Sequence, residues 1–78
     1  MKVKLIWKFY GPDCIKTANH HLIHLKDFFE ESGVESFGNG VDTKKSGLSE
    51  TYIIVSKENV DSLRKILKPH MGVLLNNY

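Results

Sequence analysis

The opening stretch KVKLIWKFY, residues 2–10, alternates between two kinds of side chain and constrains the fold more than any other segment. One set of alternate positions is wholly apolar, and the other is mostly lysine. Successive side chains of a strand point to opposite faces, so this pattern predicts a strand with one face against a core. The apolar set comprises Val3, Leu5, Trp7 and Phe9.

Two helices are predicted to cover that apolar face. After Gly11-Pro12 ends the first strand, apolar residues recur at spacings of three and four until Gly33, a natural helix stop. A second helix is expected between an N-cap at Ser56 and a stop at Pro69. The expected buried stripes are Ile15, Ala18, Leu22, Leu25 and Phe29 in the first helix, and Val60, Leu63 and Leu67 in the second.

The remaining segments favour further strands. Residues 34–45 predict either one strand with a glycine bulge or a hairpin that turns at Asn39-Gly40. TYIIVS at 51–56 and MGVLLNNY at 71–78 favour two more strands. The order β-α-β-β-α-β resembles the ferredoxin-like pattern, which implies an antiparallel sheet with two helices on one face and the first and third strands in the middle. We therefore expect residues 1–78 to form a single ferredoxin-like α+β domain.

Charge and cysteine content restrict the partners. The net charge of the 78 residues is +2, too small to indicate a nucleic-acid or membrane partner. No apolar run approaches the roughly 20 residues of a membrane span. A single cysteine cannot form an internal disulfide, which favours a reducing compartment. We expect a cytoplasmic protein with no membrane partner and no nucleic-acid partner.

The first predicted helix carries three histidines in the stretch HHLIH. His20 and His24 are four residues apart and fall on one exposed ridge with Asp27, which is a ligand spacing used by helical metal sites. The alternative is a solvated face with ordinary neighbours at helical spacing. The sequence predicts no cofactor, but this ridge is a candidate site for a divalent metal.

Cys14 and His21 are the other candidates on this helix. Cys14 lies in the first turn, where the helix dipole favours a thiolate, and a small residue there also suits the edge of a core. The segment CIKT after a strand resembles the thioredoxin-like order of strand, cysteine and helix over about the first 30 residues, although a second cysteine is absent. His21 is expected at the boundary of the core, about two turns from Cys14 and too far to act as its base.

The sheet face without helices is expected to carry large apolar groups among lysines. It would present Lys4, Ile6 and Tyr10, joined either by Tyr52 with Ile54 or by Ile53 with Val55. Leu74 and Tyr78 are expected to add to it from the last strand. Such a patch indicates an interface. The partner would be a second copy, sheet face on sheet face or edge to edge, or nucleic acid, since the sheet resembles the RNA-recognition motif in topology. The low charge and the missing Lys/Arg-Gly-aromatic signature favour the second copy.

Two interpretations of function remain at this point. The favoured one is a small cytoplasmic binding or regulatory module that forms a homodimer through its sheet. The alternative is a small enzyme or ligand-binding protein of the dimeric α+β barrel type, whose small-molecule pocket would involve Trp7, Cys14, His21 and Tyr52. No carboxylate pair or catalytic triad can be assembled from the sequence, so catalysis is left undecided.

Overall fold

A computed structural model describes residues 1–45 and 47–75. The expected order of elements, β-α-β-β-α-β, is confirmed, with one additional turn of 3-10 helix, η1. The elements are β1 (Lys2–Tyr10), α1 (Cys14–Ser32), β2 (Ser36–Lys45), β3 (Leu48–Ser56), η1 (Lys57–Asn59), α2 (Val60–Leu67) and β4 (Met71–Leu75).

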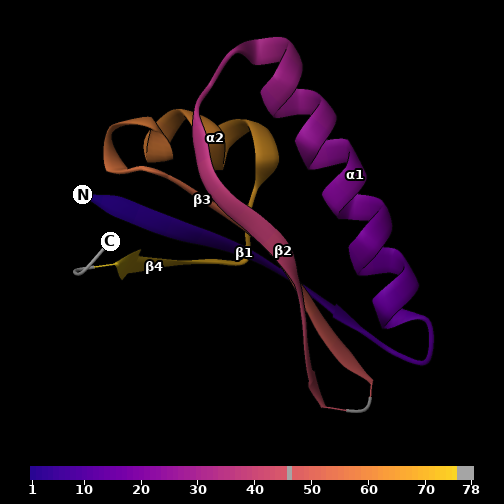
Figure 1. Cartoon of the computed structure of the whole chain (residues 1–78). Helices are drawn as coiled ribbons and strands as arrows, with labels where there is room; N and C mark the ends of the chain where they lie inside the picture. The colour runs from indigo at the N-terminus through magenta and orange to yellow at the C-terminus, as the bar shows by residue number, and fades with distance from the viewer. Residues whose placement is uncertain (46, 76–78) are drawn as a thin grey trace.

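The four strands form one sheet in the order β2-β3-β1-β4, and every neighbouring pair is antiparallel. β1 and β3 therefore lie in the middle, as the sequence predicted. Figure 1 shows α1 and α2 on the same side of this sheet. The result is an α+β domain of two layers, with β2 and β4 as the two edges.

The core lies between the apolar face of β1 and the two helices. Trp7 is only 4% exposed, and its indole Nε1–H donates to the carbonyl oxygen of Leu67 at 2.9 Å. This bond satisfies one of the carbonyl groups left open at the C-terminus of α2. The buried cluster comprises Val3, Leu5, Trp7, Leu25, Phe29, Ile53, Val55 and Leu63.

The buried stripe of α1 differs from the expected one at its start. Ile15 is 52% exposed, and Cys14 is buried in its place. The buried positions are 14, 18, 25 and 29, and His21 and Leu22 are both half-buried, so the stripe is bordered by His21, which a count of apolar residues alone leaves out. Gly33 ends the helix as predicted, with a φ of 75° and an N–H that donates to the Phe29 carbonyl.

The segment after α1 is one strand and not a hairpin at Asn39-Gly40. β2 pairs with β3 along its length, with register shifts between Ser36 and Gly38 and between Thr43 and Lys45. The chain reverses between residues 45 and 48, beside Gly47 at a φ of 81°. Ser56 is extended and η1 separates it from α2, so it does not cap that helix directly.

Candidate functional site

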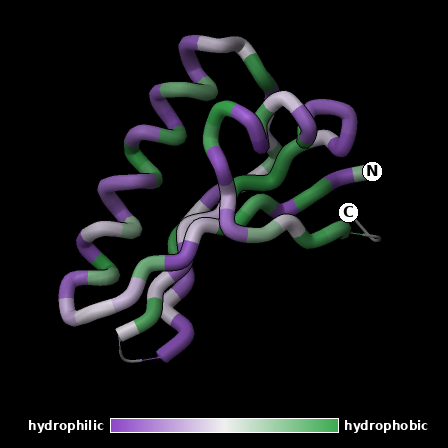
Figure 2. The backbone as a smooth tube through the Cα atoms, turned by 180° about the vertical axis from the view of Figure 1, so that it is seen from behind, coloured by the Kyte–Doolittle hydropathy of each residue, from purple (hydrophilic) through white to green (hydrophobic). Residues whose placement is uncertain are grey.

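The edge strand β4 has little cover from the rest of the described chain. Met71, Val73 and Leu74 are 41%, 37% and 47% exposed, and β1 is the neighbour that pairs with β4. The strand, MGVLL, contains no charged residue, and Figure 2 shows hydrophobic colouring along it towards its C-terminal end. Large exposed apolar groups that lie together usually mark an interface. We call residues 71–75 the β4 edge.

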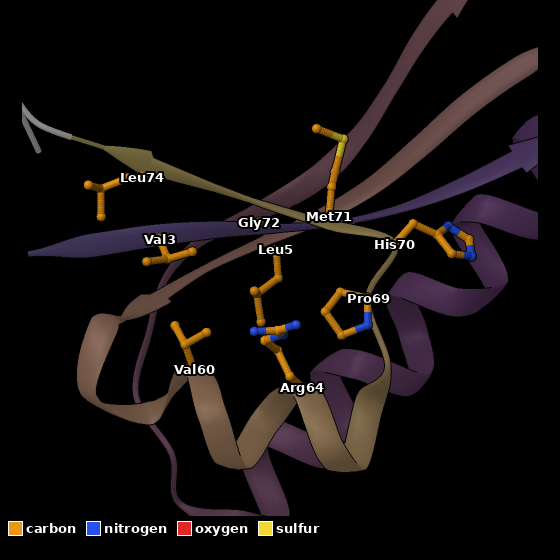
Figure 3. A pocket seen from close by; sticks show the side chains of 9 residues that line it. All are labelled: Val3, Leu5, Val60, Arg64, Pro69, His70, Met71, Gly72 and Leu74. Carbon is orange, nitrogen blue, oxygen red and sulfur yellow. The ribbon is translucent and has the colours of Figure 1, made fainter.

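A groove lies between β4 and α2 on the helix side of the sheet. Its volume is about 390 Å³. Figure 3 shows Val3, Leu5 and Leu74 pointing from the sheet towards α2, while Met71 points to the opposite face. The lining residues are Val3, Leu5, Val60, Arg64, Pro69, His70, Met71, Gly72 and Leu74. We call this cavity the α2–β4 groove.

Gly72 leaves space in the sheet-side wall of the groove. It pairs with Leu5 in the β1–β4 register, and Leu74 pairs with Val3. A methyl group on Gly72 would meet Val3 and Leu5 at 3.5 and 3.6 Å, which are ordinary contact distances. Position 72 faces the groove, but glycine has no side chain to fill it.

His70 and Arg64 border the same groove but serve partly structural roles. The Lys8 backbone N–H donates to Nδ1 of His70, and the His70 backbone N–H donates to the Ile6 carbonyl at 2.9 Å. These bonds extend the β1–β4 pairing beyond Met71. Arg64 also borders a wider surface hollow with Asp61, Lys65 and Pro69. On its α2 side the groove is thus bordered by the charged Arg64, whereas its floor is apolar.

The open face of the sheet does not expose the apolar patch that the sequence predicted. Tyr52 and Ile54 do lie on this face, opposite Ile6 and Lys4, but Ile6 and Ile54 are only 6% and 8% exposed. Leu74 lies on the helix side, because it pairs with the inward-facing Val3. Tyr78 lies outside the described residues. The expected face is therefore wrong for Ile6, Ile54 and Leu74, whereas Tyr10 is 72% exposed as expected.

Polar contacts explain why the open face is covered. The Tyr52 ring lies so close to β2 that a methyl group on Gly40 would be 2.8 Å from its hydroxyl oxygen. Lys4 Nζ lies 4.4 Å from the centroid of that ring and 3.7 Å from Asp42 Oδ2. Glu50, almost buried on the same face, lies 4.0 Å from the Lys8 ammonium. These lysines are already matched with carboxylates, which weakens any attraction for phosphate.

His21 lies in an aromatic environment on the helix side. Its ring centroid is 5.0 Å from that of Trp7 and 5.4 Å from that of Phe9. Among the described residues its buried Nε2 has no hydrogen-bond partner. Burial lowers the pKa of His21 from its usual 6.5, and the neighbouring His24 and His70 lower it further. The ring is therefore favoured in its neutral form.

Of the four residues expected to line one pocket, the structure brings together only two. Trp7 and His21 are in contact, whereas Tyr52 lies on the opposite face of the sheet. Cys14 is buried in the first turn of α1, with its Sγ 3.2 Å from Ser49 Oγ. Trp7, Cys14, His21 and Tyr52 therefore do not share a cavity.

His20 and His24 lie side by side on the exposed surface of α1. Their Nε2 atoms are 3.0 Å apart, and their rings meet edge to face with centroids 4.6 Å apart. Asp27 is exposed one turn further along. In residues 1–45 and 47–75 no group of three or more His, Cys, Asp or Glu side chains is placed to hold a metal, so Asp27 does not complete a three-ligand set with this pair.

Comparisons with family models, with curated proteins and with solved structures find no match to this chain. Within the described part of the chain, neither α1 nor α2 combines the length and the apolar character needed to cross a bilayer.

The sequence left edge-to-edge association open but did not single out β4 as the edge, and it did not predict the α2–β4 groove. A signal was present, because the predicted strand order places the last strand at an edge and MGVLL has no charge to protect it. The groove itself depends on how far α2 covers β4, which the sequence pattern does not specify.

Proposed function

We propose that this chain is a small ferredoxin-like binding module of the cytoplasm that works as a homodimer, joined along the β4 edge. The strand order β2-β3-β1-β4 and the two helices on one face support the ferredoxin-like assignment. A single cysteine, buried in the first turn of α1, suits a reducing compartment. The observation that carries the proposal is the uncovered, uncharged β4 edge.

An edge strand offers a row of unpaired N–H and C=O groups to a second strand. At the β4 edge these groups lie among exposed apolar side chains, so pairing there would bury apolar surface as well as satisfy the backbone. A second copy is the occupant with the matching chemistry, because an uncharged strand brings no like charges together about a twofold axis.

One antiparallel register fits the groove. A twofold axis at Val73 would place Leu74 of the second copy opposite Gly72, on the face of the sheet that the α2–β4 groove occupies. A five-residue strand pair is small beside the roughly 1,200–2,000 Å² of a stable interface. In both copies Leu74 would enter the groove of its partner beside Gly72. This contact would bury side-chain surface in addition to the surface that strand pairing buries.

The same axis would also place charged residues of the two α2 helices near each other. Val60 lies towards the Leu74 end of the groove, and Arg64 lies towards Gly72 (Figure 3). Two α2 helices related by the axis run antiparallel, which brings the Asp61 end of one towards the Arg64 end of the other. Opposite charges at a rim mainly favour correct orientation and faster association.

The test is the Val73→Glu substitution, with mass measured by light scattering across micromolar concentrations. Val73 pairs with Lys4 within the chain, so a glutamate there has a favourable neighbour in the monomer. In the dimer it would meet a second glutamate directly across the axis. We expect a concentration-dependent dimer mass for the wild type and a monomer mass for Val73→Glu.

The matched control is Ile23→Glu, the same change of charge at an apolar residue 58% exposed on α1. This variant should associate like the wild type. A monomeric wild type, or equal loss of association in both variants, would contradict the proposed dimer.

A further inference from the structure

We infer that the paired imidazoles of His20 and His24 form a two-histidine chelate for a borderline divalent cation such as Zn²⁺ or Ni²⁺. This site lies on the outer surface of α1, which packs against β1, β2 and β3, and so it is independent of the β4 edge. The inference rests on three observations: the distance between the two Nε2 atoms, the i, i+4 spacing of the histidines on α1 and their exposure.

The spacing of the two nitrogens matches the bite of a metal ion. With metal–nitrogen bonds of about 2.0–2.1 Å, two cis ligands are separated by about 2.9 Å at a right angle and about 3.4 Å in a tetrahedron. The observed Nε2–Nε2 distance of 3.0 Å lies between these values. The cation would replace the hydrogen bond that now joins the two rings, and each ring would turn so that both lone pairs converge on the ion.

The helix supplies the preorganisation that a two-ligand site needs. Side chains four residues apart on a helix are neighbours, and positions 20 and 24 lie in the middle of a 19-residue helix. Both rings are exposed, so a cation reaches the nitrogens without opening the fold. Since the described residues offer no third protein ligand here, water fills the remaining positions. Imidazole nitrogen selects zinc, nickel and copper over magnesium and calcium.

The experiment titrates ZnCl₂ or NiCl₂ into the full-length protein by calorimetry, with thermal unfolding as a second measurement. We expect one ion per chain and a raised unfolding midpoint in the wild type. The His24→Ala variant removes one of the two ligands and should weaken binding by roughly tenfold or more, losing the rise in midpoint.

A rescue variant separates chelation from other effects of the substitution. Lys16 is exposed on α1 four residues before His20. The double variant Lys16→His/His24→Ala therefore rebuilds the pair one turn earlier and should recover most of the binding. Equal affinity in the wild type and His24→Ala, or no gain in the double variant over His24→Ala, would overturn the inference.

Discussion

The two edge strands of the sheet, β2 and β4, differ in their charge and in the regularity of their pairing. β2 carries Asp42, Lys44 and Lys45 and has two shifts in its pairing with β3. β4 has no charged residue and pairs with β1 in one regular register from Met71 to Leu75. Charges and bulges are the features by which proteins prevent edge-to-edge pairing.

The difference supports the proposal that the second copy pairs with β4, and we call β2, which carries the charges and the register shifts, the closed edge. The charges of β2 are used within the chain, since the Lys44 ammonium lies 3.9 Å from Glu50 and 4.0 Å from Asp42. The pair of Lys44 with Asp42 is exposed on both sides, and exposed ion pairs add little stability. Their effect on β2 is better understood as exclusion of a second strand. β4 has no equivalent, and the α2–β4 groove lies beside it.

The largest expected effect comes from filling the groove within the chain. In Gly72→Leu the new side chain would occupy the space that we assign to Leu74 of the second copy. We expect the folded monomer to be retained, because Val3, Leu5 and Val60 offer apolar contacts, and the dimer dissociation constant to rise by roughly tenfold or more. Sedimentation velocity measures the change.

Gly72→Ala is the control for that substitution. Its methyl group meets Val3 and Leu5 at ordinary distances and does not reach across the groove. Association should change little. If the leucine variant associates as well as the alanine variant, the groove is not part of the interface.

A glycine substitution on β2, the closed edge, should lower the stability of the monomer and leave self-association unchanged. In Gly40→Ala the new methyl group would lie 2.8 Å from the Tyr52 hydroxyl oxygen and displace the ring that Lys4 covers. Overpacking of this kind costs roughly 1–3 kcal/mol. We expect a lower free energy of unfolding in urea with unchanged self-association, and a loss of association here would remove the distinction between the edges.

The smallest effect is a pH dependence that belongs to the core and to neither edge. The pKa of His21 is lowered in the folded state, so as pH falls below about 6.5 the unfolded chain takes up a proton first. The free energy of unfolding should therefore decrease with acidification through that range. Denaturant titrations from pH 8 to pH 5, in a buffer with chelator, measure it.

His21→Phe provides the comparison for this pH dependence. A phenyl ring keeps the contacts with Trp7 and Phe9 and removes the unpartnered nitrogen. The variant should show a shallower slope over the same pH range. An identical slope in both proteins would mean that other groups account for the acid sensitivity.

The sequence predicted the layers of this fold better than its surfaces. The alternation of residues 2–10 was sufficient to place Trp7 in the core, because period-2 patterning acts locally. The stripe of α1 was wrong at Ile15, which is 52% exposed, because Cys14 is the residue buried at the start of the helix. The alternation also predicted exposed apolar groups among the lysines of the open face. Ile6 and Ile54 are instead buried there, beside contacts of Lys4 with Tyr52 and Asp42 from strands distant in sequence.

The candidate sites were predicted unevenly for a related reason. The juxtaposition of His20 and His24 follows from helical geometry alone, so spacing was sufficient to place them together. The proposed grouping of Trp7 and Tyr52 required the pairing register of β1 with β3, which puts the two on opposite faces. The groove required the position of α2 over β4, which depends on tertiary packing.

Cross-linking through the β4 edge tests the self-association most directly. In Val73→Cys the twofold register would bring the two cysteines opposite each other, at the Cα separation of about 4.5–5.5 Å for antiparallel partners, which lies within disulfide range. We predict that mild oxidation converts this variant to a covalent dimer, while the wild type with its buried Cys14 and an Asn39→Cys variant on β2 stay monomeric on a denaturing gel. Cross-linking of the β2 variant that equals or exceeds that of Val73→Cys would contradict the account.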